Sequence, residues 1–535
     1  MNRSYKLLLS VVSGLLLAGA WPERGFPFLL FIGLVPLLLV EHAQWNKRNE
    51  NHSSGFFGYA VFSFLIFNSL TTYWIYNAAL VGAVAAILLN TLLMSLVFLL
   101  FHLTHRRMSG EGAGYLALIG YWLSFEYLHL RWDLNWPWMN LGHGFASYPQ
   151  WIQWYEFTGV FGGSLWILLV NISIFWFIQI RFIQKICSRK VGVLLIASLL
   201  AILIPVAISI FMYRNYNEAK NPIDVVVVQP NLDPYSEQYE LDPKEVTERM
   251  LVLADAKADS LTDFIVFPES ALQEYAWEDQ LDSVGSIRRI HEYCRNFPQM
   301  AAVVGMSTRK LFREGEALSL TARKFRDAER YYDAYNTALY ISHNGELQKY
   351  HKSKLTPGVE KMPYPRLFRF LEKFALDLGG TVGSLATDPV QSPFMVNDSV
   401  HIAPVICYES VYGEFVNRFL HNGANVIFVI TNDGWWGDTP GHRQHLLFSV
   451  IRAIETRRSI ARSANTGISC FISQTGDVSQ RTAYWEPAAI RSTINLNSAV
   501  TFYVKHGDYI ARIFLLIAGL FFLLTLSLSL RQRTL

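Results

Sequence analysis

Residues 404–410 read Pro404-Val405-Ile406-Cys407-Tyr408-Glu409-Ser410, and they tell more about the fold than any other part of the chain. The apolar run 402–406 predicts a buried strand, which ends abruptly at a cysteine followed by polar residues. A side chain at the end of a buried strand is held rigidly and faces a cleft, which is where a nucleophile is needed. A free cysteine is also commonly a small core residue. The position of Cys407 alone therefore leaves both interpretations open.

Two further segments also place polar side chains at the ends of strand-like runs. Ile265-Val266-Phe267-Pro268 is an apolar run that leads into Glu269, and Tyr350-His351-Lys352 leads into a loop that reaches Glu360. Together with Cys407 they supply Glu, Lys and Cys at the ends of three separate runs. For the Glu–Lys pair alone, a buried salt bridge is the alternative interpretation. A strand-end cysteine in the same chain favours catalysis instead.

Glu269, Lys352 and Cys407, in this chain order, resemble the catalytic triad of the carbon–nitrogen hydrolase (nitrilase) superfamily. Within it, the flanking apolar helices resemble those of the apolipoprotein N-acyltransferase family. The resemblance implies an α-β-β-α sandwich domain, with Cys407 as nucleophile, Glu269 as base and Lys352 as the group that stabilises the oxyanion, helped by a backbone N–H after Cys407. A base is needed because an ordinary thiol, with a pKa of about 8.5, is only a few per cent ionised at neutral pH.

The resemblance also implies supporting residues around the triad. Glu360, Tyr408 and Glu409 are expected to support Lys352 and the oxyanion. Tyr239, Trp435 and Trp436 are candidate substrate contacts. Farther on, Thr431 to Trp436 and then His445, Arg458 and Arg462 match the family's segment after the cysteine and are expected to form pocket wall and core. Arg458 and Arg462 are expected one turn apart on a helix, where structural ion pairs are the usual role.

The sequence departs from the family pattern in two loops. The family's usual Pro-Phe-Gly-Glu is Pro357-Gly358-Val359-Glu360 here, and Gln229-Pro230-Asn231 is not followed by an in-register tryptophan. Both departures concern loops around the site, and the three triad positions are filled.

Composition excludes several classes of function. The chain has 535 residues, of which 51% are hydrophobic and 17% charged, and this balance is shifted toward a membrane protein. The net charge of +3 is too small to suggest nucleic-acid binding. The four cysteines show neither CxxC spacing nor histidine partners at metal-ligand spacing, so we predict no metal site, no disulfide framework and no cofactor.

Eight long apolar runs predict membrane helices, since crossing a bilayer takes about 20 apolar residues. They are 7–20, 26–40, 56–76, 79–103, 115–128, 159–180, 191–212 and 509–530. The first run has the features of a signal peptide as an alternative. The expected domains are 1–213, a membrane domain with seven helices; 214–507, a catalytic domain; and 508–535, a last helix with its tail. Asn68, Asn90 and Asn171 within these runs are expected to form interhelical hydrogen bonds.

Lysine and arginine are concentrated in alternate connections, which orients the chain. Basic residues precede the first helix, follow helices two and four, lie between helices six and seven, and end the chain. By the positive-inside rule, both termini are cytoplasmic and the catalytic domain faces outward. The predicted location is a bacterial inner membrane, with the catalytic domain in the periplasm.

The outward domain alternates strand-like and helix-like segments, which predicts a layered α/β fold. Helices are expected at 245–258, 286–294 and 441–461, and residues 311–332 are expected to be a solvated insertion. The segment Leu367–Leu378 has apolar residues at helical spacing with interleaved basic ones. It is interpreted either as a membrane-surface helix and lid or as an ordinarily packed element.

The expected reaction transfers an acyl chain from a membrane phospholipid, through a thioester on Cys407, to the N-terminal diacylglyceryl-cysteine of an apolipoprotein. Two other classes stay open at this point. A membrane-bound amidase or lipid hydrolase would use the same triad, and a receptor or transport component would carry an inactive hydrolase domain. The apolar helices argue against a soluble amidase, and the three filled triad positions argue against an inactive domain.

Overall fold

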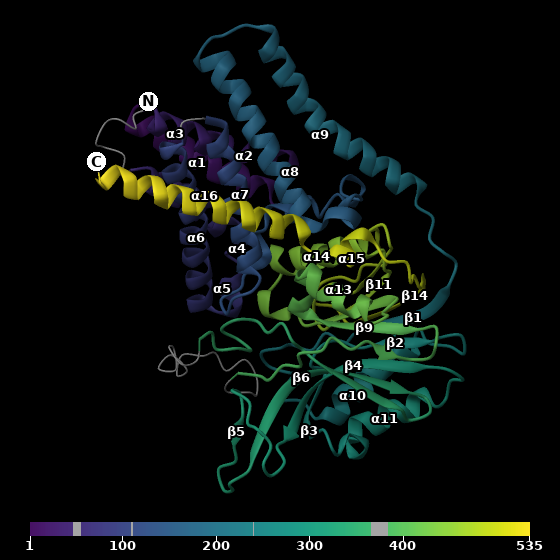
Figure 1. The fold of residues 1–535 in the computed structure, drawn as a ribbon. Coiled ribbons are helices and arrows are strands. Elements are labelled where there is room, and N and C mark those ends of the chain that lie inside the picture. Colours follow the sequence, from purple (N-terminus) through teal and green to yellow (C-terminus); the bar gives the residue numbers. More distant parts are fainter. Residues whose placement is uncertain (47–54, 109–110, 239, 365–383, 535) are drawn as a thin grey trace. The chain divides into compact units, whose positions relative to one another are not determined.

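The computed structural model describes residues 1–46, 55–108, 111–238, 240–364 and 384–534 (Figure 1). The chain forms two compact units: one is Met1–Asn215 together with His506–Leu535, and the other is Tyr216–Lys505. Two predicted elements, the segment Leu367–Leu378 and the substrate contact Tyr239, lie outside the described residues.

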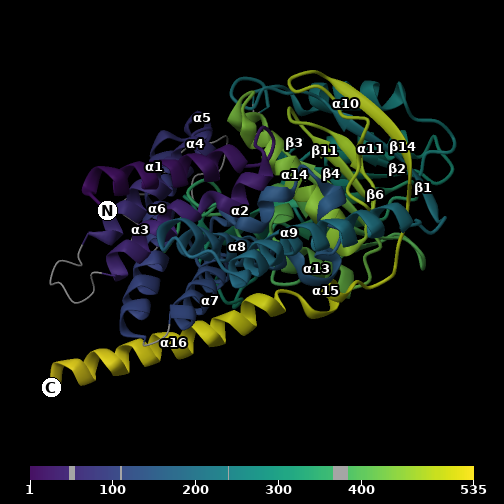
Figure 2. The ribbon, with the colours of Figure 1, turned by 90° about the horizontal axis from the view of Figure 1, so that it is seen from above.

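The first unit is made of helices that follow the apolar runs of the sequence. They are α1 (Arg3–Ala20), α2 (Leu30–Gly33), α3 (Val35–Trp45), α4 (Phe56–Thr72), α5 (Ile75–Ala78), α6 (Leu80–Arg107), α7 (Glu111–His129), α8 (Tyr155–Ile178), α9 (Arg189–Asn215) and α16 (Tyr509–Thr534). Although α16 is far from α6 and α7 in the sequence, it packs along both of them (Figure 2).

Six helical segments of the described residues are long and apolar enough to cross a membrane. They are Arg3–Ala20, Pro27–Trp45, Leu80–Arg107, Tyr155–Ile183, Arg189–Asn215 and Tyr509–Arg531. The other two predicted runs also form helices, α4 and α7, but α4 has only 17 residues. In lipid, an apolar run can form a helix because its backbone N–H and C=O groups then hydrogen-bond to one another.

Buried amides connect the helices, as the sequence predicted. Asn90 Nδ2 on α6 donates to Asn68 Oδ1 on α4 at 2.7 Å. Asn171 on α8 donates to the Leu30 carbonyl at 2.7 Å and accepts from the Leu34 N–H at 2.9 Å. These polar contacts give the helix packing specificity that apolar side chains alone lack.

The second unit contains two sheets built around parallel strands. The strands are β1 (Pro222–Gln229), β2 (Phe264–Val266), β3 (Leu272–Trp277), β4 (Ala301–Leu311), β5 (Arg323–Lys324), β6 (Tyr331–Ser342), β7 (Leu347–His351), β8 (Phe394–Met395), β9 (His401–Ile406), β10 (Val426–Thr431), β11 (Ile460–Ala464), β12 (Cys470–Ile472), β13 (Val478–Ser479) and β14 (Ala488–Asn495). The first sheet has the order β14-β1-β2-β4-β6-β5, with β3 on β4 and β7 on β6; the second has the order β13-β12-β11-β10-β9-β8.

The parallel strands are the continuous apolar runs of the sequence, because both of their faces are covered. β1, β2 and β4 run parallel in the first sheet, as do β9, β10 and β11 in the second. The sheets face one another: β11 contacts β1 and β2, and the rings of Phe264 and Phe428 meet edge to face at 5.6 Å.

Helices cover the outer faces of the two sheets. α10 (Pro243–Asp255) and α11 (Gly285–Cys294) pack on the first sheet, and α13 (Gly413–His421) and α14 (Pro440–Thr456) pack on the second (Figure 1). Short α15 (Phe502–His506) follows β14. The unit is thus a four-layer α-β-β-α sandwich, which confirms the predicted nitrilase-like α/β fold.

One helix prediction was wrong at its end. The sequence predicted a helix over 441–461, but α14 ends at Thr456 because Arg457 takes the left-handed conformation with φ of 51°. Residues Ile460–Ala464 then form β11. Arg458 and Arg462 are therefore not one turn apart on a helix; Arg462 lies in a central strand.

Candidate active site

The three predicted triad residues all lie just after strands. Glu269 follows β2 by three residues, Lys352 directly follows β7, and Cys407 directly follows β9. Glu269 and Lys352 are in contact, with Lys352 Nζ 2.8 Å from Glu269 Oε1. Cys407 lies close enough to both for its own ionisation to depend on their charges. The two sheets therefore bring these three side chains into one buried site.

Gly305 in β4 allows the turn that carries Glu269 to lie directly against the strand. A Cβ at this position would come within 2.4 Å of the Ser270 backbone nitrogen and 2.6 Å of Glu269 Cα. The Gly305 N–H also donates to the Pro268 carbonyl at 3.0 Å. Because backbone atoms cannot move aside, only glycine fits this close approach.

Glu360 and Asn336 complete a closed network around Lys352. Lys352 Nζ donates to Glu269 Oε1 at 2.8 Å and to Glu360 Oε1 at 2.9 Å. Asn336 Nδ2 on β6 donates to the same two oxygens, at 2.8 and 3.0 Å. The other Glu269 oxygen accepts from the Asn432 N–H at 3.0 Å. The lysine and both carboxylates thus have fixed positions relative to one another.

The loop that brings Glu360 back to Lys352 is a turn through Gly358. Gly358 has a φ of 80°, which glycine adopts without strain, and its N–H donates to the Lys361 carbonyl at 2.8 Å. The Thr356 N–H donates to Glu360 Oε2 at 2.9 Å. The departure from the family's usual sequence is therefore compatible with a carboxylate at the predicted place.

The two carboxylates keep the lysine charged in spite of its burial. Burial alone would lower the pKa of Lys352, but Glu269 and Glu360 raise that pKa well above its ordinary value. Burial would likewise raise the pKa of Glu360, and Lys352 instead lowers it. A charged ammonium at this point suits a group that stabilises a developing oxyanion.

Cys407 sits on a strained turn and is a thiol at rest. Its φ is 49°, in the left-handed region that L-residues rarely adopt, and its side chain is 9% exposed. Burial and then the nearby Glu269 charge raise the pKa of the thiol above its ordinary value. A reaction through the thiolate would therefore need a base, and Glu269 is a nearby carboxylate.

Glu409 joins the cysteine turn to the lysine loop. Its Oε1 accepts from the Tyr350 hydroxyl and from the Ser353 N–H, both at 2.7 Å, and its Oε2 accepts from the Ile406 N–H at 2.9 Å. The carboxyl group is completely buried, and burial raises its pKa to about 7. β7 of one sheet and β9 of the other are therefore linked by a single side chain.

The other predicted contacts among the described residues are Tyr408, Trp435 and Trp436. Tyr408 is buried, its ring is 5.3 Å from that of Tyr412, and burial raises the pKa of its hydroxyl. Trp435 and Trp436 are half-buried in the short turn after β10, where Trp436 packs edge to face on His445 at 5.5 Å. Their role as substrate contacts stays a prediction.

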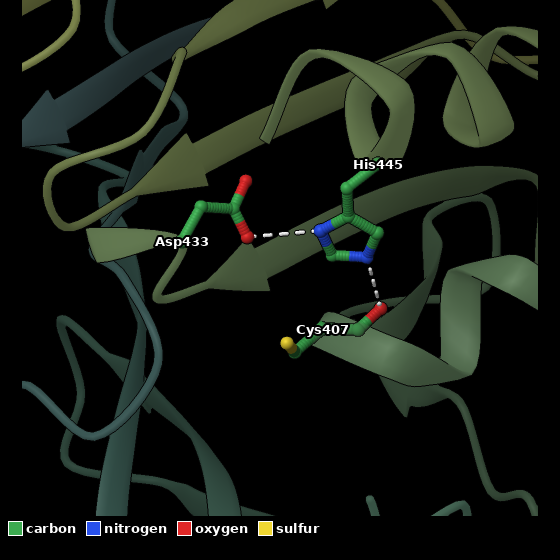
Figure 3. A group of neighbouring side chains, drawn as sticks. All are labelled: Cys407, Asp433 and His445. Carbon is green, nitrogen blue, oxygen red and sulfur yellow. Dashed lines mark hydrogen bonds and ion pairs between the residues drawn. The ribbon is translucent and has the colours of Figure 1, made fainter. Parts of the chain in front are cut away.

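Cys407, Asp433 and His445 are the one group of potential metal ligands among the described residues, with ligand atoms within 4.8 Å of one another (Figure 3). His445 Nδ1 is already 2.9 Å from Asp433 Oδ1, and Nε2 is 3.1 Å from the Cys407 carbonyl oxygen. Arg462 also bonds Asp433 at 2.7 Å, so a divalent cation here would lie beside a guanidinium. Hydrogen bonding accounts for this cluster better than metal ligation does.

Sequence reasoning missed Asn336. It is a buried amide in the middle of strand β6, between Tyr335 and Thr337. The available signal was a polar side chain at the start of a strand-like run, since buried polar groups need partners.

Comparisons with known proteins agree with this geometry. Residues 225–502, more than half of the chain, match the family model "Carbon-nitrogen hydrolase", and the chain belongs to this family. Residues 13–173 match the "Apolipoprotein N-acyltransferase N-terminal domain". Along nearly its whole length the chain is also similar to apolipoprotein N-acyltransferases.

Three such relatives show how far the similarity extends. That of Chlorobaculum tepidum is 29% identical over 99% of this chain and 98% of its own length. That of Geobacter metallireducens is 26% identical over 94% and 92%, and that of Thermotoga maritima is 26% identical over 94% and 90%. The six long apolar helices fit a multi-pass membrane protein.

Proposed function

We propose that this protein transfers an acyl chain from a membrane phospholipid to the free α-amino group of the N-terminal diacylglyceryl-cysteine of apolipoproteins. The observation that supports the chemistry is the buried network of Glu269, Lys352 and Glu360 beside Cys407. It combines a base, a fixed cation and a nucleophile in one site. The full-length similarity to apolipoprotein N-acyltransferases supports the choice of substrates.

In the first half-reaction, Cys407 attacks an ester carbonyl of the phospholipid. Glu269 takes the thiol proton, and Lys352 stabilises the negative oxygen of the tetrahedral intermediate. The ester C–O bond then breaks, the proton passes to the departing alkoxide, and lysophospholipid leaves. The acyl chain remains on the sulfur as a thioester. Because the pKa of the resting thiol is raised, the nucleophile is formed only as the proton moves to the base.

In the second half-reaction, the α-amino group of the apolipoprotein attacks the thioester carbonyl. Glu269 takes a proton from the amine and returns it to the departing thiolate, which restores the enzyme. The product is a stable amide. A thiolate is a better leaving group than an alkoxide. The amine therefore attacks the thioester more readily than it would attack the original phospholipid ester. One site used twice implies ping-pong kinetics.

The membrane arrangement is part of the same proposal. Eight helices would cross the bilayer, including α4 and α7, and the catalytic domain would occupy residues 214–507 between the seventh and the eighth. The concentration of basic residues in alternate connections supports cytoplasmic termini and a periplasmic catalytic domain. The phospholipid donor and the lipid-anchored acceptor would then reach the site from the membrane.

The experiment that tests the reaction uses the purified full-length protein with phospholipid and no acceptor. About one acyl group per enzyme should accumulate on Cys407, as seen by mass spectrometry, and turnover should stop. A synthetic diacylglyceryl-cysteine peptide should then remove the acyl group and become N-acylated. Cys407→Ala provides the control without a nucleophile. Continuous release of fatty acid, or of ammonia from added amides, would instead identify a hydrolase.

A further inference from the structure

His445 contacts the backbone of the predicted nucleophile. His445 Nε2 lies 3.1 Å from the Cys407 carbonyl oxygen, and Figure 3 draws this contact. In the tautomer with its hydrogen on Nε2, the imidazole donates to this carbonyl oxygen, which can only accept, and the same nitrogen lies 3.1 Å from the Ser410 hydroxyl oxygen. His445 is completely buried on α14. The histidine beside the cysteine thus contacts the backbone of the cysteine turn.

The imidazole is itself held by two charged residues from neighbouring strands. Asp433, just after β10, lies 2.9 Å from His445 Nδ1, and Arg462 in β11 donates to the other Asp433 oxygen at 2.7 Å. All three side chains are completely buried. Buried charged groups need fixed partners. The contacts among Asp433, Arg462 and His445 therefore fix the position of the imidazole ring.

The cysteine turn needs such support because its conformation is unfavourable. The φ of 49° at Cys407 is in the left-handed region, and surrounding contacts must hold a residue there. Two side chains hold its carbonyl: His445 Nε2 and the Ser410 hydroxyl, which donates at 2.8 Å. Both contacts fix the plane of the peptide that joins Cys407 to Tyr408.

That peptide plane also contains the Tyr408 N–H. In a trans peptide the C=O and the N–H point in opposite directions. Fixing the direction of the carbonyl therefore also fixes the direction of the Tyr408 N–H. This N–H is the backbone donor after Cys407 that the family resemblance places at the oxyanion, and a directed N–H can stabilise a negative oxygen.

We propose that His445, held by Asp433 and Arg462, is a positioning residue that aims the Tyr408 N–H at the oxyanion in both half-reactions. The inference rests on the proposed acyl transfer through Cys407. Lys352 supplies charge from one side of the oxyanion, and this backbone donor supplies a directed hydrogen bond from the cysteine turn. His445 would act through this backbone peptide and not as an acid or base.

The test compares two reactions of the same sulfur in the purified full-length protein. Acyl-enzyme formation from phospholipid passes through an oxyanion, whereas alkylation of Cys407 by iodoacetamide does not and reports the reactivity of the sulfur. His445→Asn keeps a polar group near Asp433 but is too short to reach the carbonyl. It should slow acylation about a hundredfold, as loss of an oxyanion donor does. Alkylation should change by no more than about threefold.

Two further variants and a control separate positioning from general damage. His445→Gln restores a donor near the Nε2 position and should recover most of the acylation rate. Ser410→Ala removes the second donor to the carbonyl by a one-atom change, so it tests the same idea if His445→Asn does not fold. His442→Asn is the matched control, because His442 is an equally buried histidine on α14 that stacks on Tyr484. It should leave both rates unchanged.

Each way in which the proposal could be wrong predicts a different experimental result. If the wild-type protein forms no acyl-enzyme, the proposed acyl transfer itself is wrong. If the wild type acylates and His445→Asn acylates equally fast, the positioning role is wrong. Parallel losses of acylation and alkylation, or an equal loss in His442→Asn, would show that His445 only maintains the fold.

Discussion

Replacing Lys352 by methionine should separate the structural from the chemical role of the buried network. Lys352 is 2% exposed and makes contacts of 2.8 and 2.9 Å with Glu269 and Glu360. Methionine has a similar length and no charge, so two neighbouring carboxylates would remain buried without their cation. Breaking a buried ion pair by removing one partner costs about 3–5 kcal/mol. For a unit of this size, that corresponds to a loss of about 10 °C in the unfolding midpoint.

The double variant Lys352→Met with Glu360→Gln tests the cause of that loss. It removes one of the two carboxylates, and the remaining Glu269 keeps its bonds to Asn336 and to the Asn432 N–H. Thermal unfolding of the full-length protein in detergent at pH 8 should show most of the stability restored, while neither variant forms an acyl-enzyme. A loss below about 1 kcal/mol in Lys352→Met, or a double variant no more stable than the single one, would refute a charged network.

Three further outcomes are expected. Cys407→Ala should abolish acyl-enzyme formation, whereas Cys294→Ala should retain it, because burial raises the pKa of Cys294 to about 12 and keeps it a thiol; the reverse result would mean that the nucleophile was misassigned. Alkaline phosphatase fused after residue 215 should be active and a cytoplasmic reporter there inactive; the opposite pattern would overturn the orientation. Burial lowers the pKa of His442 to about 4, below its ordinary 6.5, so as the pH falls from 8 to 5 the unfolded chain gains a proton that the folded chain does not. The wild type should lose about 2 kcal/mol more stability over this range than His442→Gln, and equal losses in thermal unfolding would contradict this assignment.

The strand-end residues could be predicted from the sequence because their signals are local. Cys407 and Glu269 each follow a short apolar run, Lys352 follows the strand-like Tyr350-His351, and the family resemblance supplied their grouping. Asn336 could not be placed in the same way. Its contact with the lysine network depends on the antiparallel register of β6 and β7, in which the Lys352 N–H donates to the Asn336 carbonyl at 2.8 Å. Such a register depends on the pairing of two separate segments, so no local sequence pattern predicts it.

The end of α14 shows a second limit. Apolar residues continue at helical spacing through Ile460, so periodicity predicted a helix to residue 461. The chain instead turns at Arg457, a non-glycine residue in the left-handed conformation. This turn places Arg462 in β11, where it bonds Asp433, whereas the sequence placed it on a helix surface. Tertiary contacts determine such a turn, and the local amino-acid composition does not predict it.

Glu409 has a consequence for how two large substrates can use one site in succession. Its carboxylate bonds the loop after β7 and the end of β9, so parting the two sheets would break several buried hydrogen bonds at once. A carboxylate stripped of these donors would be left dehydrated, which is costly. In the proposed reaction, the exchange of lysophospholipid for an apolipoprotein would therefore proceed by motion of segments outside this junction. The hydrogen bonds of Glu409 would keep the reacting centre rigid while the flexible lipid substrates exchange.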